Sequence, residues 1–265
     1  MAALHNDAIV VIKKEFEEVL KNKYILFTMS SFPLVFSVLI PLIYLFALPV
    51  NVSWADVAAF KGFVPGADAM TPRQVLVAFI VQCNLPFYLM MPSVIPTLVS
   101  SYSIVGEKKC GTLEPLLATP ASTSDILAGK ALAAIIPSVL ITWASFLIYA
   151  VLVDAMTYGI FGYAIIPNTL WLFAILVTAP LFAAMSVYLS IVISSRMNDI
   201  RAAQQVSAVF VIPIMGVFIM ELFGYLSLTI EMLLALSIAV ALMDALLIKA
   251  SVKAFDREEV LTRYA

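Results

Sequence analysis

The chain has 265 residues, of which 63% are hydrophobic and only 12% are charged. The charged share is half of the ~25% that is usual for a soluble domain, and the mean hydropathy is +1.05. A soluble domain of this size cannot bury so much apolar surface, because its exterior faces water. The composition therefore predicts an integral membrane protein.

The charge and the rarest residue types exclude several functional classes. A net charge of −2 gives no basic surface of the kind that binds nucleic acid. The single histidine, His5, excludes a histidine-dependent triad, and two cysteines, Cys83 and Cys110, cannot form a disulfide framework or a four-ligand zinc site. We therefore expect no metal or other cofactor in this chain, and we interpret both cysteines as unpaired.

Long uncharged stretches predict the membrane spans. A helix that crosses a bilayer needs about 20 mainly apolar residues, and such runs recur between the charged residues of this chain. They are too long and too uniformly apolar for the strands of a transmembrane β-barrel. The sequence thus predicts an all-α protein with six spans, near residues 25–48, 78–104, 127–153, 169–194, 203–223 and 232–252.

The second predicted span combines polar residues with residues that bend helices. Gln82 and Asn84 lie there beside Pro86, Pro92 and Pro96. Proline lacks the backbone N–H and kinks a helix, although membrane helices tolerate it. We expect this span to be the most bent, and we count Gln82 and Asn84 as possible functional groups inside the membrane.

The distribution of lysine and arginine predicts the orientation. Basic residues are enriched in the cytoplasmic loops of membrane proteins. Of the 15 in this chain, all but Lys61 and Arg73 lie before span one, in the loops that follow spans two and four or at the adjoining end of span three, or from the last residues of span six onward. We therefore expect a multi-pass protein of the cell membrane with both termini in the cytoplasm and its longest external loop over residues 49–77.

The N-terminal segment, residues 4–23, predicts an amphipathic helix that lies in the cytoplasmic interface. Apolar side chains fall on one helical face and charged ones on another, and Glu17 and Lys21 form an opposite-charge pair four residues apart. A solvated helix packed on a partner is the alternative. The apolar run that follows is too long for a cleaved signal peptide.

The loop between spans two and three, residues 106–130, carries the most informative motif. Gly106 and Gly111 are spaced like the glycines of a P-loop, but Thr112 and Leu113 follow where that loop needs Lys and then Ser or Thr. A membrane helix, not a strand, precedes it. We therefore expect no nucleotide site in this chain.

The same loop predicts a two-helix projection. Thr112 is suited to cap a first short helix that ends at Pro120, and Ser122 with Asp125 has the spacing of a capping box for the next helix. The first helix is expected to expose an apolar face made of Leu113, Leu116 and Leu117. Exposed leucines suit docking to a partner protein; a plain connector between spans is the alternative.

The residues of this loop resemble the signature of ABC-2 type transporter permeases. The usual form of that signature is close to E-R/K-E-x-G-T-L-E-x-L-L-x-T-P-x-S. This chain departs from it at Lys109, where an acid is common, and residues 254–265 resemble the family's terminal R-E-x-x-L-x-R pattern. The matching positions are Glu107, Lys108, Gly111, Thr112, Leu113, Glu114, Leu116, Leu117, Thr119, Pro120, Ser122, Ile126, Leu127, Gly129 and Lys130.

The resemblance implies a fold and a set of partners. Such permeases have six spans and an N-terminal interfacial helix, so residues 1–265 are expected to form one ABC-2 type transmembrane domain. They pair as dimers and bind two copies of a separate ABC ATPase subunit. ATP and Mg²⁺ bind to that partner, and this chain is then not itself an enzyme.

The resemblance also implies a mechanism, in which the loop after span two, residues 106–125 here, sits in a cleft of the ATPase as the coupling element. Movement of the ATPase pair then drives export by alternating access. The residues to which the resemblance assigns ATPase coupling are Glu107, Gly111, Thr112, Leu113, Glu114, Leu116, Leu117, Thr119 and Pro120. We expect the leucines to supply affinity, and Glu107 and Glu114 to meet basic residues of the ATPase.

Two other functions stay open. The first is a non-transporting membrane anchor that relays ATPase motion to an external partner. The second is an intramembrane enzyme, which needs a cluster of catalytic side chains. Only Asp244 lies well inside a span, which argues against the enzyme.

Several polar or small residues outside the loop have their own interpretations. Asp244 is a possible functional group because a carboxylate inside a membrane is costly, and an ion pair with Lys249 is the alternative. Glu221 and Glu231 flank the last external loop and are expected at the membrane interface. Close helix packing is predicted for two spaced sets, Ser186, Ser190 and Ser194 in span four and Ser237, Ala241 and Ala245 in span six.

Overall fold

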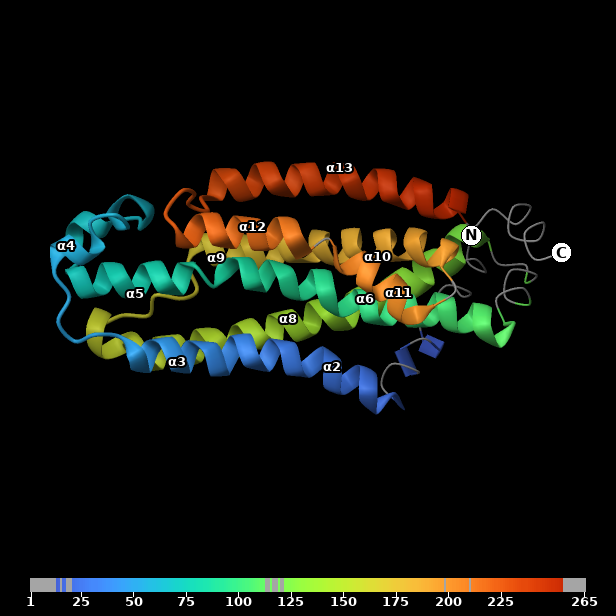
Figure 1. Ribbon diagram of the computed structural model, residues 1–265, viewed down its shortest axis with the longest axis horizontal. Coiled ribbons are helices and arrows are strands. Elements are labelled where there is room, and N and C mark those ends of the chain that lie inside the picture. Colours follow the sequence, from blue (N-terminus) through green and yellow to red (C-terminus); the bar gives the residue numbers. More distant parts are fainter. Residues whose placement is uncertain are drawn as a thin grey trace.

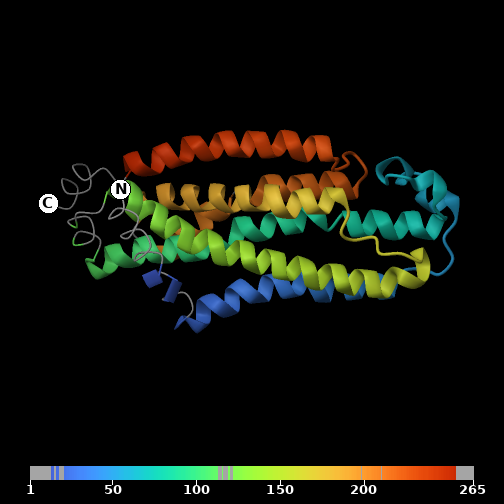
Figure 2. The same cartoon turned by 180° about the vertical axis from the view of Figure 1, so that it is seen from behind.

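A computed structural model of the protein describes residues 13, 14, 16, 17, 21–112, 115, 119, 122–197, 199–209 and 211–254. Within these residues every regular element is a helix and no strand occurs. The long helices lie roughly parallel in one elongated bundle (Figures 1 and 2). We call the end of the bundle at which α2 begins and α13 ends the terminal end, and the opposite end the distal end.

Six helical stretches are long and apolar enough to cross a membrane, which confirms the predicted number. Their bounds are Phe27–Ala47, Pro72–Cys110, Thr123–Phe161, Thr169–Arg196, Ile200–Leu222 and Ile230–Ala254. The second and third are longer than predicted because their helices continue into polar sequence. The elements are α2 (Lys23–Leu34), η1 (Val35–Leu39), α3 (Ile40–Ala47), α4 (Trp54–Val57), η2 (Lys61–Phe63), η3 (Ala67–Ala69), α5 (Pro72–Gln82), α6 (Leu85–Cys110), α8 (Thr123–Phe161), α9 (Thr169–Phe173), η4 (Ala174–Thr178), α10 (Ala179–Arg196), α11 (Ile200–Ala208), α12 (Val211–Leu222) and α13 (Ile230–Ala254).

The bend predicted for the second span is a break between α5 and α6. Pro86 has no N–H for the carbonyl of Gln82, and its ring crowds that carbonyl, so the helix cannot run through. Cys83 and Asn84 form a turn there, and the Asn84 Nδ2 atom donates to the carbonyl of Ile80 at 3.0 Å. The break therefore follows from one proline and is closed by the amide beside it.

Two other prolines are preceded by a widened helical turn. The π-helical segments η1 and η4 lie just before Pro41 and Pro180. A π turn shifts the hydrogen-bond pattern by one residue, which accommodates a residue that cannot donate. The first and fourth spans thus stay continuous where the second one breaks.

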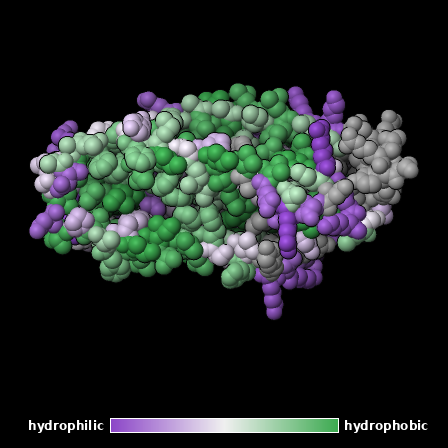
Figure 3. Space-filling view, in the orientation of Figure 1, coloured by the Kyte–Doolittle hydropathy of each residue, from purple (hydrophilic) through white to green (hydrophobic). Residues whose placement is uncertain are grey.

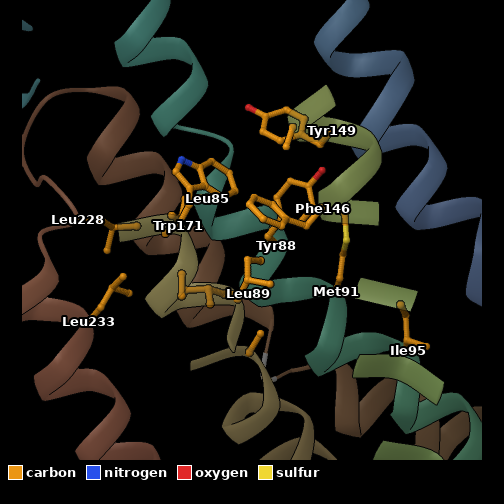
Figure 4. Close-up of a cluster of buried hydrophobic side chains, with 14 of the residues drawn as sticks. Leu85, Tyr88, Leu89, Met91, Ile95, Phe146, Tyr149, Trp171, Leu228 and Leu233 are labelled. Carbon is orange, nitrogen blue, oxygen red and sulfur yellow. The ribbon is translucent and has the colours of Figure 1, made fainter. Parts of the chain in front are cut away.

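A buried aromatic cluster joins three helices of the bundle (Figure 4). Its members, from α6, α8 and α9, are Tyr88, Phe146, Tyr149 and Trp171. The Trp171 ring lies 5.4 Å from those of Tyr88 and Tyr149 and stacks on Phe146 at 5.5 Å. The Tyr149 hydroxyl donates to the carbonyl of Val81 at 3.2 Å, so the cluster also supports the broken span.

The serine spacing in span four does pack helices, as predicted. Ser186, Ser190 and Ser194 are all buried, and the Ser190 hydroxyl lies 2.9 Å from that of Ser101 on α6. Small side chains let two helix backbones approach closely in a membrane protein. They place α10 directly against α6, between α8 and α13 (Figure 2).

The corresponding prediction for span six is wrong in part. Ser237 is buried and its hydroxyl lies 2.9 Å from that of Thr178, but Ala241 and Ala245 are exposed. The buried face of α13 is offset from the predicted one, because α13 covers the bundle with a single narrow stripe. That stripe consists of Leu233, Ser237, Val240, Asp244 and Ser251.

Most of the predicted interfacial helix over 4–23 lies outside the described residues. Its described residues 13, 14, 16, 17 and 21 are helical. The predicted pair is formed, with the Lys21 Nζ atom 3.2 Å from a Glu17 carboxylate oxygen.

The distal end is covered by the loop that follows α3, which includes α4, η2 and η3. Its Val57 and Val64 pack with Val75 and Phe79 of α5 in a small separate core. The Lys61 Nζ atom lies 2.7 Å from Asp68, and this contact lowers the pKa of the Asp68 carboxyl. The loop is therefore an ordered cover that packs on α5.

Candidate functional site

The terminal end gathers all the exposed basic side chains of the described residues except Lys61. Figure 3 shows hydrophilic side chains concentrated there, next to a broad apolar middle. The exposed basic residues at this end are Lys13, Lys14, Lys21, Lys23, Lys109, Arg196, Arg201, Lys249 and Lys253. This end also holds the described part of the loop over 106–125.

Gly111 begins that loop by ending α6 in a left-handed turn, with φ at +66°. The Gly111 N–H donates to the Lys108 carbonyl at 3.2 Å and the Thr112 N–H donates to the Glu107 carbonyl at 3.0 Å. This bond pattern is the Schellman motif, which satisfies the last carbonyls of a helix. The Thr112 hydroxyl also lies 3.4 Å from the Glu107 carbonyl, so it bonds back to α6.

Substitutions at Gly111 measure the cost of its left-handed backbone conformation without a change in side-chain packing. No heavy atom lies within 4 Å of the place where a Cβ atom would be, so a side chain meets no clash. We expect Gly111→Val to lower the free energy of unfolding by about 1–2 kcal/mol, because a β-branched residue disfavours the left-handed region. Gly111→Asn should cost clearly less, since asparagine tolerates that region. Equal losses for both variants, measured by SDS titration in mixed micelles, would contradict this reason.

Glu107, one turn before Gly111, forms a largely buried ion pair. Its Oε1 atom lies 2.8 Å from the Nζ atom of Lys130 on α8, and the Lys130 side chain is only 3% exposed. The same ammonium donates to the Ser103 hydroxyl at 2.8 Å. Lys14 also approaches Glu107 at 3.5 Å. This carboxylate therefore binds α8 and the N-terminal segment, whereas the sequence suggested that it meets the ATPase.

Lys108, the next residue, binds the end of α10. Its ammonium donates to the carbonyls of Ser194, Ser195 and Met197 at 3.1, 2.5 and 3.2 Å. The last carbonyls of a helix lack partners within the helix and attract a cation. Consecutive residues of α6 thus connect it to α8 on one side and to α10 on the other. We call Glu107, Lys108, Lys130 and Ser103 the terminal clamp.

The helix that follows α10 begins beside the clamp. Asp199 caps α11 by accepting from the N–H groups of Ala202, at 3.2 Å, and Arg201, at 2.7 Å. These bonds and the positive charge of Lys109 hold the pKa of the Asp199 carboxyl below its usual value. The start of span five is thereby fixed next to the end of α6.

The Ser122 N-cap predicted at the far side of the loop is confirmed, whereas the Asp125 carboxylate bonds to the Ser122 hydroxyl in place of the backbone N–H that a full capping box needs. The Ser122 hydroxyl accepts from the Asp125 N–H at 3.1 Å and donates to its carboxylate at 2.5 Å. These bonds begin α8 at Thr123. Local bonds therefore fix both ends of the loop: the sequence predicted the Ser122 cap, but it placed Thr112 as the cap of a following helix and not as part of the end of α6.

Of the residues assigned to ATPase coupling, Glu107, Gly111, Thr112 and Thr119 are described, and Thr119 is exposed. The others, Leu113, Glu114, Leu116, Leu117 and Pro120, lie outside the described residues.

The possible functional groups inside the membrane do not form one site. Gln82 and Asn84 lie at the break in span two, where the Gln82 Nε2 atom donates to the Leu228 carbonyl at 3.4 Å. Asp244 lies on the stripe of α13 that packs on α10, near Tyr188. The proposed ion pair of Asp244 with Lys249 is wrong, because both carboxylate oxygens are buried without a hydrogen-bond partner.

Glu221 also differs from its predicted place. Glu221 is only 1% exposed, and neither of its carboxylate oxygens has a hydrogen-bond partner. The sequence suggested a position at the membrane interface. Glu231 is exposed, as expected. The reason is that α12 turns Glu221 toward Gln82 and Leu228 of the bundle.

Lys130 is a buried member of the clamp to which the sequence assigned no role. It lies inside the span predicted over 127–153, among the buried residues Leu127, Ala131 and Ala134 of one helical face. A lysine on such a face needs a partner, and this rule could have identified it as a paired residue. The identity of the partner required the structure, since Glu107 is on another helix.

Within the described ranges, no group of three or more His, Cys, Asp or Glu residues is placed to hold a metal ion. A comparison with protein families matches residues 9–257 to the family described as ABC-2 family transporter protein. A comparison with curated proteins finds no similar sequence.

Proposed function

Because this chain belongs to the ABC-2 family of transporter proteins, we propose that it is the membrane subunit of an ATP-binding cassette exporter that a separate ATPase drives. A homodimer of this chain then spans the membrane and binds two ATPase subunits, and substrate crosses by alternating access. In this proposal residues 1–265 form one domain, and residues 4–23 lie as a helix along the cytoplasmic interface.

The terminal clamp is the observation that carries the mechanism. The loop over 106–125 contains the matched coupling motif, and α6 enters it while α8 leaves it. Because Glu107 and Lys108 join α6 to α8 and α10, a force on the loop acts on three spans together. We propose that closure of the ATPase pair pushes this loop and tilts α6, α8 and α10 as one unit.

The test of this function is transport by the purified complex in sealed vesicles. We expect ATP-dependent movement of a solute, together with ATP hydrolysis that needs this chain. Hydrolysis without movement of any solute from a panel of drugs, lipids and peptides would favour the anchor that relays motion to an external partner. The absence of both activities from a correctly assembled complex would contradict the exporter function.

The orientation has a direct test that uses a native cysteine. Cys110 is exposed at the end of α6 and Cys83 is buried, so an impermeant maleimide should label Cys110 alone. With the terminal end in the cytoplasm, labelling should require permeabilised cells. In a chain that lacks both native cysteines, Ala69→Cys at the exposed distal loop should be labelled in intact cells. Labelling of Cys110 from outside would reverse the orientation.

A further inference from the structure

A cavity of about 670 Å³ opens at the distal end of the bundle. This volume lies within the range of roughly 300–1,000 Å³ that is typical of small-molecule sites. Its walls come from α5, from the residues on either side of the turn after α8, and from the segment between α12 and α13; they include Gln82, Phe161, Tyr163, Asn168, Trp171 and Leu228. Tyr163 and Asn168 are exposed, so the cavity is open to the surface.

The apolar part of the wall is aromatic and firmly held. Trp171 belongs to the central aromatic cluster and also lines the cavity, and Figure 4 shows its ring between Leu228 on one side and Tyr88 with Phe146 on the other. Its backbone N–H donates to the Asn168 Oδ1 atom at 3.1 Å. A wall of this kind suits a hydrocarbon or a ring system and excludes a strongly hydrated ion.

A buried carboxyl group without a hydrogen-bond partner lies next to the polar part of the wall. Glu221 lies behind it, beside the Gln82 side chain and the Leu228 backbone, with both carboxylate oxygens buried and unbonded. No basic residue of the described ranges forms an ion pair with Glu221. A buried carboxyl group of this kind needs a donor or a cation.

The amide between this carboxyl group and the cavity is weakly held. The Gln82 Nε2 atom is 3.4 Å from the Leu228 carbonyl, which is beyond the usual range for such bonds. Glu221 itself does not line the cavity, so a ligand there has to displace the Gln82 side chain to reach the Glu221 oxygens.

We propose that this cavity binds an amphiphile with a protonated amine head, whose ammonium pairs with Glu221 and whose apolar part lies against Trp171 and Phe161. Such an amine comes from a soluble lipophilic compound or from a phosphatidylethanolamine head group. Binding at this site does not require the ATPase, so the binding experiment tests this proposal independently of the proposed export function.

The test is equilibrium binding to the chain in nanodiscs of phosphatidylcholine. The probe is dansylcadaverine, a primary amine, and its N-acetylated form is the neutral control of the same size; energy transfer from tryptophan reports binding. We expect saturable binding of the amine at least tenfold tighter than that of the acetylated probe. Equal affinities for the two probes would overturn the proposal without any substitution.

Three variants locate the site. Glu221→Gln should weaken binding of the amine about tenfold or more and leave the acetylated probe unchanged. Ala78→Phe, which fills the cavity from α5, should weaken both. Asp244→Asn alters a second buried carboxyl group without a partner, which does not line the cavity, and should change neither. Unchanged amine binding in folded Glu221→Gln would overturn the proposal.

Addition of phosphatidylethanolamine to the discs identifies the source of the amine. A rise in the apparent Kd of dansylcadaverine supports a lipid head group as the occupant, and an unchanged Kd supports a soluble amine.

Discussion

Replacement of Lys130 by methionine should lower the free energy of unfolding by about 3–5 kcal/mol. The substitution leaves the Glu107 carboxylate without its closest cation, and removal of one partner of a buried pair typically has a cost of this size. The decrease in the free energy of unfolding should be near the lower end of this range, because Lys14 remains 3.5 Å from Glu107. SDS titration of the purified chain in mixed micelles measures it.

The controls for this prediction come from the same two helices. Lys109→Met removes an exposed charge two residues from Glu107 and should change stability by no more than about 0.5 kcal/mol. The double variant Glu107→Leu with Lys130→Met removes both charges and should recover most of the stability. A loss below 0.5 kcal/mol for Lys130→Met alone would show that the ion pair does not hold α6 to α8.

The double variant also distinguishes the contribution of the ion pair to protein stability from its contribution to the coupling of ATP hydrolysis and transport. If the clamp transmits force, the double variant should assemble with the ATPase but show reduced solute movement per ATP hydrolysed. Full transport by this variant would limit the pair to a structural role.

Replacement of Leu117 by aspartate should abolish docking of the ATPase. Leu117 lies in the coupling motif, outside the described residues, and the proposed contact buries it in an apolar cleft. Loss of such a buried leucine costs about 1.5–3 kcal/mol, which weakens binding by roughly 10- to 150-fold. The desolvation of the new charge adds to that loss. Co-purification of the ATPase with the tagged chain measures the effect.

Two variants of the same loop serve as controls. Leu117→Met nearly conserves the volume and should keep the ATPase bound. Glu114→Ala should leave the complex assembled but lower substrate-stimulated hydrolysis, because a rim carboxylate sets orientation more than affinity. Full ATPase binding and transport with Leu117→Asp would remove this loop from the coupling mechanism.

Much of the fold could be predicted because each span has a local cause. Length and hydropathy define the six helices, Pro86 sets the break in span two, and Ser122 with Asp125 begins α8. These signals lie within a few residues of the structure they determine. The error in span six has the opposite cause, since the rotation of α13 depends on the helices it contacts.

The clamp and the distal cavity depended on tertiary contacts that no local pattern encodes. Lys130 could be expected to need a partner, but only the packing of α6 on α8 selects Glu107. In the same way, Gln82 was noted in the sequence, whereas Trp171 and Leu228 meet it only in the folded bundle. Burial of Glu221 could not be predicted because its position in sequence suggested a loop end.

Photocrosslinking from Cys110 tests the central claim most directly, namely that the loop after α6 contacts an ATPase. The native chain carries this one exposed cysteine at the entry to the loop, and Cys83 is buried. Benzophenone maleimide attached to Cys110 in native membranes should, after irradiation, yield an adduct that contains an ABC ATPase subunit, and Leu117→Asp should eliminate it. Adducts that contain only other proteins, from fully labelled and folded chain, would contradict the account.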